Sequence, residues 1–183
     1  MRIICQHSNS IMFSNIDADI LGRIEAMRAQ EDATSPRCNY FKISTTSDDI
    51  DKEGRMSLVI WLRKVQTALK LSPETVWIAL SYLDRYLSSG KGASQEALKC
   101  RYKFQLAAIT SFWIAVKIYE SMKLNVSTLV KLCKGYYEES EIVSTEEDIL
   151  YALDWRVTTP TPMEFVRIFM ELLPRITKSS PIS

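Results

Sequence analysis

The 183-residue chain has little of what catalytic and metal sites are built from. It has one histidine, His7, and four widely separated cysteines: Cys5, Cys38, Cys100 and Cys133. This pattern leaves no spacing typical of a zinc site, and isolated thiols favour a reducing intracellular compartment over a disulfide framework. A Gly-rich phosphate loop and a carboxylate pair at metal-ligand spacing are also missing. We therefore expect a protein that is not an enzyme and that needs neither a metal nor a cofactor.

The chain also lacks an excess of either charge and a long apolar run. Lys and Arg number 23 against 22 for Asp and Glu, so no strong attraction to nucleic acid or to an anionic membrane is indicated. The most apolar segment, Leu106 to Val116, is too short to span a bilayer, and the N-terminus is not typical of a signal peptide. We expect protein partners and a location in the nucleus, the cytoplasm or both.

Only five glycines and no sustained Val/Ile/Thr alternation argue against a sheet, so the predicted fold is all-α. The first 13 residues are expected to be poorly ordered, and 31–47 to be a connector. The segment 106–116 is apolar on every side, which predicts a buried central helix. The periodicity and the start and stop signals predict helices over 17–30, 48–69, 72–88, 102–121, 127–133 and 139–153, with one more beginning at 162 and reaching about 173.

These helices divide the chain into three parts. We expect an N-terminal arm with one amphipathic helix over 1–47, a compact five-helix bundle over 48–157, and a C-terminal extension with a short helix over 158–183.

Asp84 stands at helical spacing from Trp77, Leu80 and Leu87, so its carboxylate is expected to face the core. A lone buried carboxylate is costly unless it is paired. Arg55 is a similar charge within the apolar stripe of the preceding helix. We therefore predict an ion pair between Arg55 and Asp84, with snorkelling of each side chain at the bundle edge as the alternative.

Several segments together resemble the cyclin box, in the order in which that family carries them. The resemblance runs from about 53 to 165, and its motifs are the segments 55–62, 82–88, 103–108, 115–120 and 146–155. Five positions that define the box carry the expected residue: Arg55, Asp84, Leu106, Lys117 and Glu146. Too few residues follow Pro162 for the second five-helix repeat of many cyclins, so we expect a single-box cyclin or a fragment.

From the residues alone, Lys117 and Glu146 are a surface salt bridge or two solvated charges. The resemblance implies more. In cyclins, the matching lysine and glutamate bind backbone groups beside the regulatory helix of a cyclin-dependent kinase, and Ile118, Leu150 and Val157 would pack on that helix. The implied function is a regulatory subunit that binds and allosterically activates such a kinase in cell-cycle control. The alternative is a cyclin-fold scaffold or transcription-related adaptor without kinase activation.

The resemblance implies a second surface, a shallow groove that holds Arg-x-Leu docking peptides of substrates or inhibitors. Three residues depart from the pattern of such grooves: Gly54 replaces a methionine, Ile60 an aspartate, and Lys64 the glutamate that receives the peptide's arginine. A lysine repels an arginine. Leu58 and Trp61 have a second interpretation as core residues. The expected groove residues are Leu58, Trp61, Arg101 and Gln105.

Overall fold

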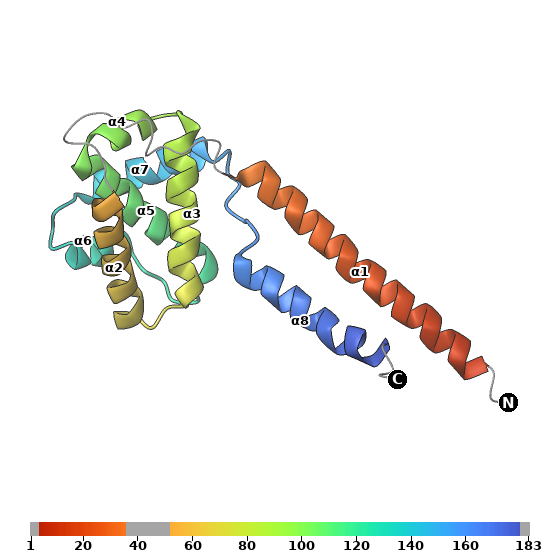
Figure 1. Cartoon of the computed structure of the whole chain (residues 1–183). Coiled ribbons are helices and arrows are strands. Elements are labelled where there is room, and N and C mark those ends of the chain that lie inside the picture. Colours follow the sequence, from red (N-terminus) through yellow and green to blue (C-terminus); the bar gives the residue numbers. More distant parts are fainter. Residues whose placement is uncertain (1–3, 36–51, 180–183) are drawn as a thin grey trace. The chain divides into compact units, whose positions relative to one another are not determined.

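The computed structural model describes residues 4–35 and 52–179, and within them every regular element is an α-helix, which confirms the predicted all-α class (Figure 1). The elements are α1 (Ile4–Thr34), α2 (Lys52–Ala68), α3 (Pro73–Ser89), α4 (Ser94–Lys99), α5 (Arg101–Tyr119), α6 (Val126–Leu132), α7 (Glu139–Ala152) and α8 (Pro162–Ser179).

Two expectations about local structure were wrong. The first described helix begins at Ile4, so a helix covers most of the first 13 residues, where none was expected; this stretch contains no proline or glycine that would stop a helix. The helix α4 was not predicted at all, because Gly90 and Gly92 indicate a loop. Both glycines do adopt positive φ, and the extra helix starts directly after them. The bundle between 52 and 157 therefore has six helices, α2 to α7.

The boundaries of α3 follow from local signals. The Ser72 Oγ accepts a hydrogen bond from the backbone N–H of Glu74 at 3.3 Å, and Pro73 occupies the first turn. At the other end Gly90 has a φ of 66°, the left-handed conformation that ends many helices. The sequence prediction of 72–88 differs by one residue at each end.

The helix α5 forms the centre of the bundle. Every residue from Leu106 to Val116 is buried, and α2, α3, α4 and α7 pack against this helix (Figure 1). Burying a large apolar side chain such as Phe112 stabilises a fold by roughly 1.5–3 kcal/mol. The expected buried central helix is therefore present, and its two ends carry the residues of the candidate sites.

Residues 35–157 form one compact unit, and residues 1–34 with 158–183 form another. In the second unit α1 and α8 are in contact, and Arg23 Nη1 lies 3.3 Å from Glu171 Oε2. The Gln30 side chain donates a hydrogen bond to the carbonyl oxygen of Thr158. None of the helices in the described ranges is long and apolar enough to cross a membrane.

Candidate functional site

Arg55 and Asp84 join α2 to α3 through two contacts. Arg55 Nη1 lies 2.8 Å from Asp84 Oδ1, and Nη2 donates to Oδ2 at 2.9 Å. The side chains are 21% and 26% exposed, so the pair lies at the bundle edge and not deep in the core.

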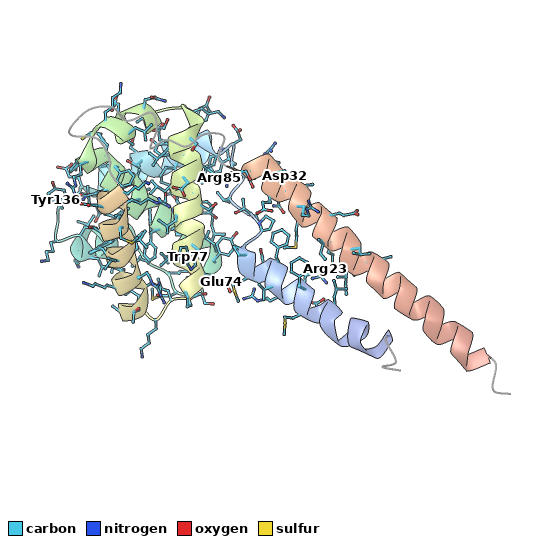
Figure 2. The ribbon with its side chains drawn as sticks, viewed as in Figure 1. Arg23, Asp32, Glu74, Trp77, Arg85 and Tyr136 are labelled. Carbon is cyan, nitrogen blue, oxygen red and sulfur yellow. The ribbon has the colours of Figure 1, made fainter. Side chains whose placement is uncertain are left out.

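The orientation of α3 differs from the expectation that Asp84 faces the core. The stripe that contains Trp77, Ser81 and Asp84 is the least buried side of α3, and Trp77 is 57% exposed (Figure 2). The reason is that α2, α4, α5 and α7 all pack against α3 and bury its other sides, large and small residues alike. A stripe of apolar residues on this helix therefore does not identify its core side.

Lys117 is held in place at the C-terminal end of α5. Its ammonium group lies 3.7 Å from the ring centroid of Trp113, one turn earlier, and forms an ion pair with Glu146 of α7. The Trp113 ring is itself fixed, because its Nε1–H donates to the carbonyl of Leu124 at 2.7 Å. The side chain of Glu146 is only 15% exposed, against 37% for that of Lys117.

Val157 is tied to the same region through its carbonyl oxygen. This oxygen accepts hydrogen bonds from the hydroxyl of Tyr119 at 3.3 Å and from the hydroxyl of Tyr82 on α3. Burial and the nearby Tyr119 raise the pKa of Tyr82, so its hydroxyl stays protonated and can donate. The segment after α7 is thereby fastened to the end of α5.

The apolar residues that accompany the ion pair differ in their exposure. Ile118, next to Lys117, is 43% exposed, whereas Leu150, one turn after Glu146, and Val157 are partly buried. Lys117 and Ile118 lie at the end of α5, Glu146 and Leu150 lie on α7, and Val157 follows α7. The ion pair joins the two helices, and the hydrogen bond from Tyr119 joins Val157 to the end of α5. A rim of charges beside accessible apolar side chains is the usual composition of a protein interface.

A groove of about 320 Å³ lies between α2, the start of α5 and the α6–α7 loop. Leu58, Trp61, Arg101 and Gln105 all line it, so the four groove residues expected from the sequence come together there. Leu58 is nevertheless buried and Trp61 partly buried, which makes both residues part of the core as well. Gly54 also lines the groove, whereas Ile60 and Lys64 are not among its lining residues.

Sequence reasoning missed the opposite wall of this groove. That wall contains Cys133, Lys134, Tyr136 and Tyr137, from the segment that links α6 to α7. The adjacent tyrosines after Gly135 were the available signal, because binding residues are often found on loops.

A second hollow of about 370 Å³ lies beside α7 and contains Asp148. Its carboxylate is already engaged by the protein: Oδ2 accepts from the Tyr86 hydroxyl at 3.0 Å and from the backbone N–H of Ala93 at 2.8 Å. These bonds fasten the α3–α4 connection to α7, so we assign the hollow a structural role. Among the described residues, no group of three or more His, Cys, Asp or Glu side chains is arranged to hold a metal ion.

Comparison with known proteins places this architecture in one family. A family model described as "Cyclin, N-terminal domain" matches residues 23–158. The chain is 34% identical over 155 residues to the carrot (Daucus carota) "G2/mitotic-specific cyclin C13-1", covering 85% of this chain and 42% of that protein. It is 35% identical over 123 residues to "G2/mitotic-specific cyclin-2" of Antirrhinum majus, covering 67% of this chain and 26% of that protein. The chain thus spans less than half the length of these relatives.

A solved structure shares the fold. The viral cyclin from herpesvirus saimiri superposes with a TM-score of 0.63 at 21% identity, over 85% of this chain and 66% of that one. The family match over most of the chain, the relatives above 30% identity and the common fold agree. The chain therefore belongs to the cyclin family, whose members are non-catalytic regulatory subunits.

Proposed function

We propose that this chain binds a cyclin-dependent protein kinase through Lys117, Glu146, Ile118, Leu150 and Val157, and that it activates the kinase allosterically in cell-cycle control. The observation that supports the proposal most directly is the fixed Lys117–Glu146 pair beside the exposed Ile118. The names of the matched relatives, which describe mitotic cyclins, favour a cell-cycle role. Its proposed location is that of its kinase, in the nucleus, the cytoplasm or both.

The proposed mechanism is a shift of a two-state equilibrium. A protein kinase is active when the glutamate of its C-helix pairs with the lysine that positions ATP. A partner that binds this helix only in its active position increases the population of that state. Lys117 and Glu146 are suited to hydrogen-bond backbone groups near the helix, because one offers donors and the other acceptors. Ile118, Leu150 and Val157 supply the apolar contact.

The pair itself provides the test. The variant with both Lys117→Ala and Glu146→Ala should lose at least about tenfold in affinity for purified cyclin-dependent kinases, since tenfold corresponds to about 1.4 kcal/mol and truncating hot-spot side chains costs about 2 kcal/mol or more. Binding is measured by titration calorimetry, and activation by phosphorylation of a peptide substrate. The double substitution leaves the net charge unchanged, so long-range electrostatics is not altered.

A matched control is available in the same unit. Lys91 and Asp154 form an exposed ion pair, with Nζ 2.6 Å from Oδ1, outside the proposed interface. Lys91→Ala with Asp154→Asn removes this pair at equal net charge, and asparagine tolerates the φ of 52° found at that position. This control should bind and activate as the native chain does. Equal kinase binding by both double variants would contradict the proposed site.

The scaffold or adaptor alternative gives a different result. A cyclin-fold adaptor would bind none of the purified kinases, or would bind one without raising its activity. Binding together with activation favours the regulatory subunit, so the two readouts separate the hypotheses.

A further inference from the structure

The groove between α2, α5 and the α6–α7 loop presents hydrogen-bond donors that the protein does not use. Across the residues that the structure describes, the Trp61 indole N–H and the Gln105 amide take part in no hydrogen bond, and Arg101 and Lys134 in no ion pair. Three of these side chains only donate, and the Gln105 amide both donates and accepts. The groove is therefore suited to a ligand rich in acceptors.

The charge of the groove has one sign. Among the residues that the structure describes, Arg101 and Lys134 are its charged lining residues, and no carboxylate lines it. At the adjoining start of α7 the carboxylate of Glu141 is occupied, because its Oε2 accepts from the Tyr102 hydroxyl at 2.7 Å and from the backbone N–H of Glu138 at 3.0 Å. A basic ligand would therefore face two cations in the described lining of the groove.

The exposed ring of Tyr136 lines the groove and is held in position by neighbouring rings. Tyr136 is 63% exposed (Figure 2), yet its ring lies 5.5 Å from that of Tyr102 and 5.1 Å from that of Tyr137. Its backbone follows a fixed turn, in which the N–H of Gly135 donates to the carbonyl of Val130 at 2.9 Å. Tyr136 and Trp61 both line the groove, and a positioned aromatic ring there is a preformed contact surface for an apolar side chain.

We propose that this groove binds an extended acidic segment of a partner protein, with an apolar side chain between Trp61 and Tyr136 and carboxylates toward Arg101 and Lys134. The proposal uses no residue of the kinase-binding site and does not depend on it. It reverses the charge of the Arg-x-Leu ligand that the family resemblance implies. A volume of about 320 Å³ holds a few side chains of a peptide and not a folded domain.

Direct peptide binding to the full chain tests the proposal. Fluorescence anisotropy is measured with three labelled peptides of equal length that share Leu and Phe anchors and carry Asp/Glu, Asn/Gln or Arg/Lys at the other positions. The acidic peptide should bind at least about tenfold more tightly than the neutral one, with the basic peptide weakest, and the difference should shrink as salt is added.

Charge reversal in the groove supplies the decisive variant. Arg101→Glu with Lys134→Glu should invert the order, so that the basic peptide binds best. Lys103→Glu is the matched control, because Lys103 lies on the same helix but does not line the groove, and it should keep the native order. The exposed Tyr136→Ala change should weaken all three peptides, and circular dichroism checks that each variant is folded.

Several outcomes would overturn the proposal. These are equal or tighter binding of the basic peptide, no binding of any peptide, or an unchanged order in the charge-reversed variant. A dimer in sedimentation that the Tyr136→Ala change dissociates would assign the groove to a second copy. Acidic-peptide binding that arises only after Asp48, Asp49 and Asp51 are changed to Asn would assign it to the chain's own segment before α2.

Discussion

Arg55 of α2 and Asp84 of α3 meet through two contacts of 2.8 and 2.9 Å at the edge of the helix bundle. Two-point contacts between a guanidinium and a carboxylate fix direction as well as distance. We infer that the pair sets the position of α2 against α3. Its partial exposure means that solvent screens part of the attraction.

The first prediction concerns the energy of this pair. Arg55→Met should lower the free energy of unfolding by roughly 1–3 kcal/mol, less than for a fully buried pair, because the partly covered Asp84 carboxylate loses the guanidinium of Arg55. Urea denaturation measures the change. Adding Asp84→Leu to Arg55→Met should recover part of the loss, since no partly covered carboxylate remains at this position. An unchanged unfolding midpoint in the single variant would show that the pair does not contribute to the stability of the fold.

The second prediction separates the stability of the Lys117–Glu146 pair from its proposed role in binding. The double alanine variant should lose no more than about 1–2 kcal/mol, as expected for a partly exposed ion pair and one cation–π contact. Lys117→Ala alone should cost more than the double change, because Glu146 is largely covered and would lack a counter-charge. Thermal unfolding of the three variants gives the comparison, and a single variant as stable as the double one would contradict it.

The third prediction concerns Gly92, which needs both its backbone conformation and its lack of a side chain. Its φ is 55°, and a Cβ there would overlap the carboxylate of Asp148. Gly92→Ala should therefore destabilise the fold by at least about 1 kcal/mol more than Gly90→Ala does, because overpacking is added to the backbone strain. Gly90 is the control, since it has a similar φ of 66° and its nearest contact would be 3.6 Å. Urea unfolding of both variants should rank them in this order.

The fourth prediction is a pH dependence at the start of α7. The backbone N–H of Glu138 and the Tyr102 hydroxyl donate to Glu141, and these bonds hold the pKa of that carboxyl below its ordinary value of 4.5. A carboxyl whose pKa is lowered by folding stabilises the folded state at pH values above its ordinary pKa. This stabilisation disappears as the pH falls through the pKa of the folded state.

Glu141→Gln should accordingly lower the melting temperature at pH 7, and its difference from the native chain should shrink below about pH 4. Glu139→Gln, in the same turn of α7, is the control and should show a smaller effect. Melting curves from pH 3 to 8 measure the difference in melting temperature between each variant and the native chain. A difference that stays constant over this range would rule out the carboxylate as its source.

The fifth prediction concerns the thiol in the groove. Burial raises the pKa of Cys133 to about 11, so very little thiolate is present at neutral pH. Iodoacetamide at pH 8 should modify Cys133 more slowly than the exposed Cys100 in the folded protein, and at a comparable rate after unfolding. Peptide mass spectrometry identifies the modified residue. Fast modification of Cys133 in the native state would indicate a more open groove wall.

Helix positions were predictable where local chemistry decides them. Ser72, Pro73 and Gly90 bracket α3, and the all-round apolar character of 106–116 indicates a buried helix, as observed. The short helix α4 was missed because the glycines before it dominate the local pattern. Its six residues would hardly be stable alone, and packing against α3 and α5 maintains it.

The candidate sites depended on information from distant parts of the chain. Lys117 and Glu146 were identified by resemblance, and only the folded chain brings them together and adds Trp113 beneath the lysine. Tyr136 could not be connected to Trp61 from the sequence, because the two residues lie far apart in the chain and only the fold brings both to the groove.

By itself, the sequence determined that the chain is helical, which segment forms the central helix, and that the pattern is that of a cyclin box. These properties depend on side-chain periodicity and on capping residues, which act over a few residues. Only the tertiary structure decided which side of α3 is exposed, and hence that Asp84 and Trp77 lie at the bundle edge. Exposure depends on how many neighbouring helices pack against a helix, and no local pattern contains that number.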